Sequence, residues 1–327
     1  MSLTAFLSGA SGFVGSNLAR ELVSQGWNTH VLVRPDSSLT ELEGISLTVH
    51  EGDLTDRDSL ISAMPADVDA VFHVAASTNF WSRKNDEQDR VNMGGTRHMI
   101  DAAESAGAKR FIHTSSFTTW GFRDGEVSEK SDRNANTDWI NYVRSKYLAE
   151  ETVLRANEAG RIDAVILNPA HILGPGDLNN WSRMIRMADQ GKLIMAPPGG
   201  GNFCDVQKVA RAHVQAFNRG RSGEKYLLGG EYADFTEVVR ITGEVLGKRV
   251  PRSAAPAWTM RAWGQVNAAF ARLTGNPPDI TPESAAMVSY RMACDSGKAQ
   301  TELDYEFTPL RTLIENTAEW MKTKGLL

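Results

Sequence analysis

Short apolar runs alternate with longer amphipathic runs along the first half of the chain. Short runs rich in β-branched and aromatic residues are typical of buried strands, and they occur at residues 3–7, 29–33, 45–49, 68–74, 109–114 and 161–167. Longer runs with apolar residues at helical spacing occur at 13–24, 86–106 and about 138–159. This alternation predicts an α/β fold in which helices cover both faces of a parallel sheet.

A glycine-rich turn joins the first expected strand to the first expected helix. Its glycines are Gly9, Gly12 and Gly15, which would permit a tight turn, the close approach of a pyrophosphate and close helix packing respectively. A helix N-terminus carries unpaired N–H groups and partial positive charge, so it binds phosphate well. The strand, turn and helix together predict a dinucleotide site, with contacts from Gly9, Ser11, Gly12, Phe13, Val14 and Gly15.

The pattern loosens after Gly174. Helices are expected at 179–190, 206–218 and 236–246, a strand at 225–228, and mainly helix from 255 onward. We therefore expect a Rossmann-like, doubly wound domain over 1–173 and a smaller, mostly helical substrate-binding domain over 174–327. Segments near 203–228 could instead return to the main sheet, so the boundary stays open.

The end of the second strand indicates which dinucleotide binds. An acidic residue there accepts from the ribose 2′-hydroxyl, whereas an arginine pairs with a 2′-phosphate. Here the residue is Arg34, followed by Ser37 and Ser38 as further donors. NADP(H) is therefore favoured over NAD(H), although a solvated surface arginine is the other interpretation. Asp53, after the third strand, is a candidate for the adenine amino group or an ordinary turn residue.

Tyr142 and Lys146 form the best catalytic pair in the sequence. They are four residues apart in an expected helix, so both side chains project from one face. A nearby cation favours the phenolate and lowers the tyrosine pKa, which would let Tyr142 exchange a proton with a carbonyl or alcohol oxygen. Ser116, at the end of the preceding strand, is placed to hydrogen-bond the same oxygen. Tyr-x-x-x-Lys also arises by chance in amphipathic helices. The catalytic interpretation therefore depends on the dinucleotide turn and on the Ser-Ser pair that precede it in the chain.

Composition and charge exclude several other classes. The chain has 327 residues, 41% of them hydrophobic, and a net charge of −5, which gives no reason to expect nucleic acid or a membrane as partner. Two distant cysteines without metal-ligand spacing predict no metal site and a reducing, cytoplasmic location. No signal segment or apolar run of membrane-spanning length is expected. A hydrolase is disfavoured because the sequence lacks both G-x-S-x-G and a zinc-spaced histidine pair.

Taken together, the ordered motifs resemble the extended short-chain dehydrogenase/reductase family, of the NAD-dependent epimerase/dehydratase type. They cover the first half and comprise the glycine turn, Gly52-Asp53-Leu54, His73 to Ala76, Asn92 with Gly95-Thr96, Ser115-Ser116, Tyr142 to Lys146, and Asn168-Pro169-Ala170 leading to Gly174-Pro175-Gly176. Val33-Arg34-Pro35 and Leu273-Thr274-Gly275 are most similar to the dihydroflavonol-4-reductase-like branch.

The resemblance implies roles for particular residues. It implies a catalytic triad of Ser116, Tyr142 and Lys146, with Asn92 organising the active-site backbone or a water, and Lys146 also reaching the ribose. The implied cofactor contacts are Asp53 and Leu54 at adenine, Ala75 and Ala76 on the nicotinamide side, and Pro169 and Ile172 at the carboxamide. His73 lies in line with a buried strand and is expected to be structural.

Two departures from the family pattern narrow the range of expected substrates. Gly121 stands where plant flavonoid reductases carry a substrate-contacting Asn, and the Arg of nucleotide-sugar epimerases is absent near Gly200–Phe203. The favoured activity is reduction of a small-molecule ketone or aldehyde; the alternative is a sugar or nucleotide-sugar epimerase/dehydratase with tightly bound NAD. Candidate pocket residues, each of which could equally belong to the core, are Phe80, Trp81, Phe117, Trp120, Phe122, His171 and Trp181. A homodimer through the helices at 86–106 and 138–159 is left open.

Overall fold

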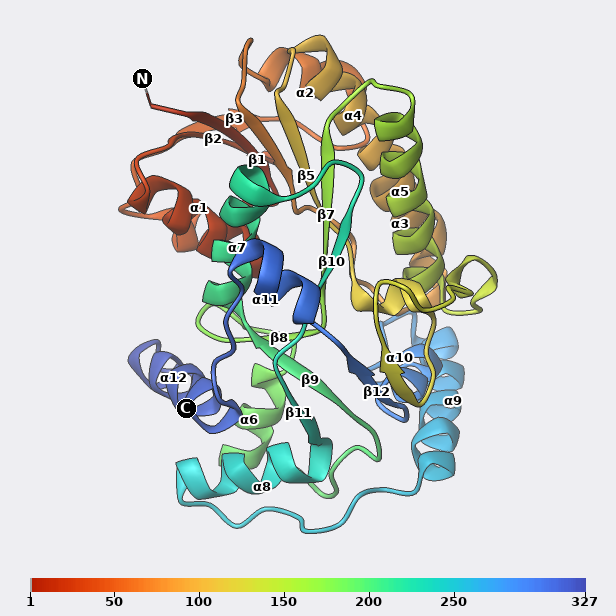
Figure 1. The fold of residues 1–327 in the computed structure, drawn as a ribbon. Helices are drawn as coiled ribbons and strands as arrows, with labels where there is room; N and C mark the ends of the chain where they lie inside the picture. The colour runs from red at the N-terminus through yellow and green to blue at the C-terminus, as the bar shows by residue number, and fades with distance from the viewer. Residues whose placement is uncertain (1) are drawn as a thin grey trace.

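A seven-stranded parallel sheet forms the larger part of the molecule (Figure 1). The computed structural model describes residues 2–327, apart from the side chain of Arg272. The strands are β1 (Thr4–Ser8), β2 (Asn28–Val33), β3 (Thr48–Glu51), β4 (Ala70–His73), β5 (Arg110–Thr114), β7 (Ala164–Pro169) and β10 (Lys225–Leu228). Their order is β10-β7-β5-β4-β1-β2-β3. Strands β2 and β3 therefore lie on one side of β1 and the later strands on the other, which makes the space between β1 and β4 the switch point of the strand order. Ligands of doubly wound folds bind at this switch point, beyond the carboxyl ends of the strands.

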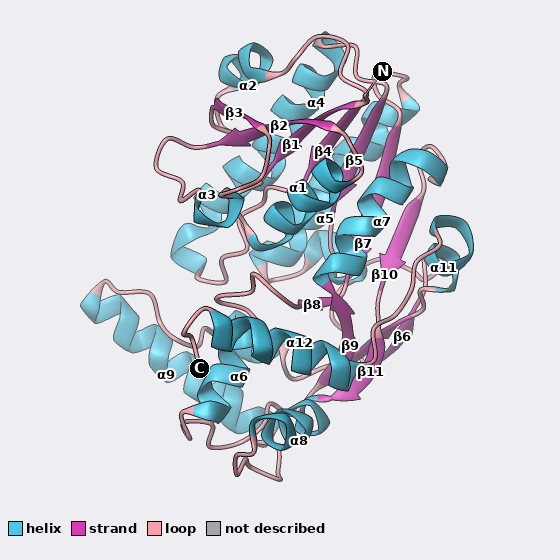
Figure 2. Ribbon diagram, turned by 90° about the vertical axis from the view of Figure 1, so that its left-hand side faces the viewer, coloured by secondary structure: helices cyan, strands magenta, loops and turns pink. Residues whose placement is uncertain are grey.

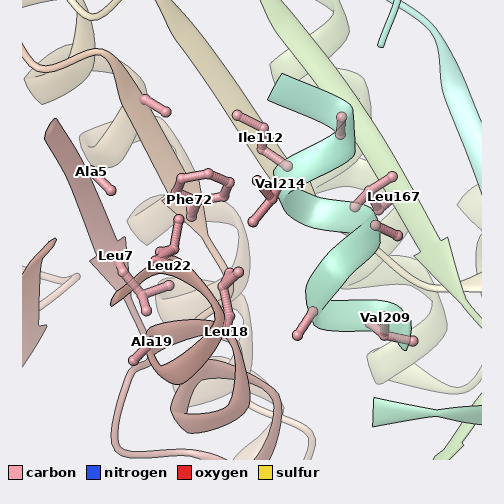
Figure 3. Close-up of a cluster of buried hydrophobic side chains, with 14 of the residues drawn as sticks. Ala5, Leu7, Leu18, Ala19, Leu22, Phe72, Ile112, Leu167, Val209 and Val214 are labelled. Carbon is pink, nitrogen blue, oxygen red and sulfur yellow. The ribbon is translucent and has the colours of Figure 1, made fainter. Parts of the chain in front are cut away.

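Helices cover both faces of this sheet because successive residues of each strand point to opposite sides. Leu7 of β1 lies in the core shared with α1 (Phe13–Ser24) and α7 (Val206–Arg219), as Figure 3 shows, together with α11 (Gly297–Leu303). Phe6, the preceding residue, lies in the opposite core with α2 (Arg57–Ala63), α4 (Gly95–Ser105) and α5 (Asn141–Glu158). The Rossmann-like parallel sheet predicted from the sequence is thus confirmed.

The long helix predicted over 86–106 is interrupted. It consists of α3 (Asn85–Asp89), a π-helical turn (Arg90–Gly94) and α4. A Cβ added at Gly95 would lie 2.8 Å from the Cβ of Leu54, so this glycine allows α4 to approach the loop after β3. Such π-turns are frequent at functional sites, and this one contains Asn92.

A second, smaller sheet, which the sequence did not predict, supports the C-terminal part. Its strands are β6 (Gly125–Val127), β8 (His171–Leu173), β9 (Gly200–Asp205), β11 (Glu231–Asp234) and β12 (Arg291–Cys294), ordered β11-β9-β12-β6 with β8 beside β9. Residues far apart in sequence meet here, since Met292 pairs with Gly125. Sequence periodicity detects local patterns, so it gives little signal for such short, distant pairings.

The remaining helices surround this second sheet (Figure 2). They are α6 (Ser182–Asp189), α8 (Phe235–Leu246), α9 (Ala257–Thr274), α10 (Pro282–Met287) and α12 (Leu310–Thr323), which makes the C-terminal part largely helical as expected. Meanwhile α7 and β10 lie in the layers of the main sheet. Among the described residues, no helix combines the length and apolarity needed to cross a membrane.

Candidate active site

One cleft of about 1030 Å³ gathers nearly all of the predicted site residues. It lies at the carboxyl ends of the parallel strands and reaches into the C-terminal part. Its lining includes Gly9, Ser11, Gly12, Phe13, Val14, Gly15, Arg34, Asp53, Leu54, Phe80, Ala75, Ala76, Ser116, Phe117, Tyr142, Lys146, Pro169, His171, Ile172 and Trp181. The volume is large enough for a dinucleotide and a small substrate together.

The glycine turn has the geometry of a phosphate cradle. Gly9 has a φ of +79°, and a Cβ there would lie 2.7 Å from the backbone nitrogen of Ala75, so no other residue fits. A Cβ on Gly15 would lie 2.0 Å from the carbonyl oxygen of Gly9, which explains the third glycine. No described side chain caps the N-terminus of α1 at Gly12, so the first N–H groups of the helix stay open to the cleft.

The rim of the cleft carries the residues expected near adenosine. Arg34 directly follows β2, with its side chain about 64% exposed and 3.5 Å from the carboxylate of Asp36. Asp53 accepts hydrogen bonds of 2.7 Å from the backbone and hydroxyl of Thr55. These bonds, more than the nearby Arg34, lower the pKa of Asp53. Asp53 therefore lines the cleft while it also holds the turn.

At the centre of the cleft, Tyr142 and Lys146 of α5 stand opposite Ser116, which follows β5. Burial raises the pKa of Tyr142, while a hydrogen bond with the Ser116 side chain lowers it in part. From the sequence, Lys146 was expected to lower this pKa. Instead, the Lys146 ammonium donates a 2.7 Å hydrogen bond to the carbonyl oxygen of Thr114, so its charge is directed to the backbone.

Lys146 itself is a buried cation. Burial lowers its pKa from 10.5 to about 8, although the negative charge of Glu150, one helical turn further on, acts in the opposite direction. Such a group changes its protonation state within reach of physiological pH, which suits a site that handles protons.

Glu150 organises a polar network behind Ser116, Tyr142 and Lys146, and this network was not expected from the sequence. Its fully buried carboxylate accepts from the Ser115 hydroxyl and, at 2.8 Å, from the amide of Asn168. Arg133 forms a 2.8 Å ion pair with it and stacks over Trp120. The network ties β5, β7 and α5 together directly beneath the cleft. The four-residue spacing from Lys146 was the available signal, because it places Glu150 one turn along the same helix face.

Asn92 does not line the cleft but holds its wall. Its side chain accepts a 2.7 Å hydrogen bond from the Ser77 N–H and donates to the Ser77 carbonyl and the Ser145 hydroxyl, both at 3.0 Å. The side chain thus joins the loop after β4 to α5. His73 is buried and hydrogen-bonded to Ser8 and Thr96, and burial lowers its pKa to about 3, so the expectation of a structural histidine is met.

The structure separates the aromatic candidates into two groups. Phe80, Phe117 and Trp181 line the cleft, with Phe80 5.1 Å from the Tyr142 ring. By contrast, Trp120 is fully buried in the core, and Trp81 and Phe122 do not line the cleft. In the short helical turn after Ser116, Phe117 and Thr118 line the cleft, whereas Trp120 does not, so proximity in sequence did not place all of these side chains at the site.

His171 lines the cleft between aromatic rings. Its ring centroid lies 4.8 Å from that of Trp181 and 5.1 Å from that of Phe117, both edge-on. Burial lowers its pKa to about 3, so the imidazole is neutral. Further lining comes from segments that carry no motif, and sequence reasoning missed them: Leu178, Asn179, Asn180 and Met287.

The chain is similar in sequence and in fold to several known proteins. The model described as "NAD dependent epimerase/dehydratase family" matches residues 5–229. A Synechocystis protein that carries the name dihydroflavonol 4-reductase is 29% identical over 98% of this chain and 95% of its own. The 2-alkyl-3-oxoalkanoate reductase of Stenotrophomonas maltophilia is 30% identical over 83% of this chain and 85% of its own. The crystal structure of gox2253 matches all of both chains with a TM-score of 0.85 and 31% identity.

Proposed function

The chain belongs to the NAD-dependent epimerase/dehydratase family, as its motifs predicted, and we propose that it is an NADPH-dependent reductase of ketones or aldehydes. The observation that carries the proposal is that Ser116, Tyr142 and Lys146 share one cleft with the glycine turn. A cofactor held along this turn would lie across the switch point of the sheet.

The chain supplies a fitting cradle for the cofactor. The uncapped N-terminus of α1 offers N–H groups and partial positive charge to the pyrophosphate, and a Cβ at Gly9 or Gly15 would fill the space. Ala75 and Ala76 line the cleft, and their small side chains would let the nicotinamide approach the backbone after β4. Lys146 would reach the ribose with an N–H other than the one that donates to the Thr114 carbonyl. When bound, the nicotinamide supplies the hydride.

Arg34 supports NADPH over NADH. Its guanidinium is exposed at the cleft rim, where it would pair with a 2′-phosphate. Asp36, its present ion-pair partner at 3.5 Å, is itself exposed and loosely held. An Arg34→Ser variant should lose about tenfold or more in kcat/KM with NADPH while that with NADH changes little, and steady-state kinetics with both cofactors measure this.

Tyr142 is the proposed proton donor. Its raised pKa keeps the phenol protonated at neutral pH, as reduction requires. As the carbonyl carbon gains hydride, the phenol gives its proton to the carbonyl oxygen, and the hydrogen bond with Ser116 holds the donor in place. Lys146, which donates to the Thr114 carbonyl, fixes α5 against the end of β5.

The cleft wall favours an apolar ketone. Phe80, Phe117, Trp181 and Met287 provide apolar surface, and neutral His171 provides a polar group among them. The relative from Stenotrophomonas maltophilia is named for a ketone that carries an alkyl chain. A flavonoid-contacting Asn has no room at position 121, since Gly121 has a φ of +78° and a Cβ there would lie 2.0 Å from the Asn134 side chain.

The test is NADPH oxidation with a panel of alkyl and aryl ketones, aldehydes and nucleotide sugars. We expect turnover with apolar ketones and a loss of at least about 1000-fold in kcat for Tyr142→Phe, with unchanged NADPH binding measured by fluorescence. Full turnover by Tyr142→Phe would refute the assignment. Isomerised nucleotide sugar without net NADPH consumption would favour the epimerase alternative.

A further inference from the structure

The imidazole of His171 stands in an aromatic corner of the cleft. Its ring lies edge-on to those of Trp181 and Phe117, with centroids 4.8 and 5.1 Å away, and both of these residues line the cleft with it. The rings of Phe203 and Phe235, 5.5 and 5.7 Å away, belong to the buried core of the C-terminal part. A polar ring is thus set among apolar ones where the cleft meets that core.

A glycine of β9 makes room for this ring. His171 of β8 pairs with Phe203 of β9, which places Gly201, two residues earlier, on the same face of the small sheet. A Cβ on Gly201 would lie 2.5 Å from both Cδ2 and Nε2 of His171, so this edge of the ring rests on bare backbone. The strand below and the aromatic rings around it together fix where the imidazole stands.

Both ring nitrogens of His171 are open to the cleft. Neither has a hydrogen-bond partner among the described residues. Neither is sealed inside the protein, in contrast to both nitrogens of His113, which are buried without a partner. The buried His73 and His213 are instead hydrogen-bonded at both of their nitrogens. His171 therefore keeps its hydrogen-bonding capacity for whatever enters the cleft.

This imidazole acts as an uncharged group, because burial lowers its pKa to about 3. A neutral imidazole has one N–H donor and one acceptor nitrogen. A polar group buried among apolar side chains costs free energy unless it is hydrogen-bonded. Water would serve in the free protein, and a substrate that displaces this water must offer an oxygen in its place.

We propose that His171 determines substrate specificity, and that the ketone carries a second, uncharged oxygen that hydrogen-bonds the His171 imidazole. This inference rests on the proposed reductase function, in which Tyr142 holds the oxygen that is reduced. Ser116, which hydrogen-bonds Tyr142, directly precedes Phe117 in the chain. The Phe117 ring in turn meets His171, so both oxygens would belong to one small molecule. The substrate class is that of keto esters, diketones and hydroxy ketones with an otherwise apolar body.

A carboxylate fits this corner less well than an uncharged oxygen. A carboxylate buried beside a neutral imidazole and apolar rings needs a cation to pair with it. Of the cations that line the described cleft, Arg34 and Arg90 are exposed rather than set among these rings. Lys146 is bonded to the Thr114 carbonyl at the end of β5. An uncharged oxygen needs only the N–H of His171.

Steady-state kinetics with matched pairs of ketones test the proposal. Each pair holds a keto ester and the plain ketone of the same chain length, and the series varies the number of methylene groups between the two carbonyl groups. We expect the unchanged protein to prefer the keto ester at one spacing. The ratio of kcat/KM for that keto ester to kcat/KM for its plain partner should fall about tenfold in His171→Phe, which keeps a ring in the seat and removes both nitrogens. The loss should appear in KM more than in kcat, because the bond holds substrate and transition state alike.

Two further variants and a control test whether the position of the imidazole matters. His171→Asn keeps a donor and an acceptor near the position of Nδ1 and should restore part of the ratio. Gly201→Ala keeps the histidine but should lower the ratio, because the new Cβ would displace the ring from its seat. His50→Phe is the matched control, since His50 is partly buried, bonded to His30 and outside the cleft lining. It should leave the ratio as it is.

Binding to the oxidised complex separates this inference from the reductase assignment. Protein loaded with NADP+ has no hydride to give, so calorimetric titration with the keto ester measures binding without turnover. His171→Phe should weaken this binding about tenfold. If no ketone is reduced by the NADPH complex while this loss of binding is seen, the reductase assignment fails and the role of His171 stands.

Two results would overturn the role of His171. One is a ratio in His171→Phe equal to that of the unchanged protein, or a ratio lowered as much by His50→Phe. The other is a higher kcat/KM for keto acids than for their esters in the unchanged protein, because the second group would then be a carboxylate. In either case turnover of ketones by NADPH would leave the reductase assignment intact.

Discussion

The carboxyl end of the main sheet around Lys146 and Glu150, called the rim here and distinct from the cleft edge at Arg34, differs from helix α9 in what it buries. The two regions depart from ordinary burial in opposite directions. At the rim, polar and charged groups are buried: Lys146 is 4% exposed and Glu150 fully buried. In α9, apolar groups are exposed, up to 85% at Leu273. Each departure costs free energy in an isolated protein, and such costs concentrate at functional sites. The rim thus holds polar groups inside the protein, whereas α9 presents apolar side chains outside it.

The two regions also differ in how they are held. Buried charges at the rim are fixed by many partners, so that removal of one leaves the others unsatisfied. Helix α9 instead packs on the start of α10 at Gly264, where a Cβ would lie 3.1 Å from the Cα of Pro282, and its large apolar side chains lie exposed. Substitutions that leave a buried charge of the rim without its partner should therefore be costly and those on α9 nearly neutral for folding, and the predictions below follow that order.

Glu150→Gln should give the largest loss. It removes the charge that pairs with buried Arg133 and changes the acceptor of Ser115 and Asn168, so unfolding free energy should fall by about 3–5 kcal/mol. Denaturant unfolding measures the loss. The control is Glu151→Gln, since Glu151 pairs with the same Arg133 at 3.2 Å but is partly exposed, and should cost under about 1 kcal/mol. Equal losses of unfolding free energy in the two variants would show that the buried Glu150 network does not stabilise the fold in this way.

Gly15→Ala should come next. The new Cβ would lie 2.0 Å from the Gly9 carbonyl oxygen, and neither backbone can yield without moving α1 from the turn. We expect a loss of about 3 kcal/mol in stability and of NADPH affinity together. Gly26→Ala is the control for a glycine near the same helix with open space around it, although its φ of +80° carries a smaller strain. Unfolding and cofactor titration measure both effects, and intact NADPH binding in Gly15→Ala would contradict the cradle.

The difference between the regions also explains what the sequence could predict. The glycine turn, Arg34 and the Tyr142–Lys146 pair were predictable because each depends on a strand, turn or helix whose residues are close in sequence. Trp120 was a candidate for either the pocket or the core and lies in the core, because a short irregular turn does not reveal side-chain direction in advance. Met287 and the second sheet depend on contacts between distant segments, as where Met292 pairs with Gly125, and local patterns do not encode these.

Lys146→Met should separate function from stability at the rim. Because burial lowers the folded-state pKa of Lys146 to about 8 from 10.5, the folded chain releases this proton before the unfolded chain does. Stability due to Lys146 therefore rises with pH between about 8 and 10.5, and its penalty is fully present below 8. Methionine removes the charge, so stability at pH 7 should rise by about 1–3 kcal/mol while turnover falls at least about 100-fold. Unfolding free energies measured across this pH window test the direction of this change. The contribution of Lys146 should rise with pH in the unchanged protein and be absent in the variant.

Leu273→Ala should have the smallest effect and gives the sharpest comparison. The same substitution at Leu18, fully buried between α1 and the sheet, creates a cavity and should cost about 2–5 kcal/mol, because transfer and packing are both lost. The Leu273 side chain is 85% exposed, so its truncation removes little buried surface. The unfolding free energy should therefore change by no more than about 0.5 kcal/mol. Thermal unfolding of the two variants side by side measures the contrast. A cost above about 1 kcal/mol at Leu273 would mean that the outward side of α9 is already covered within the free protein.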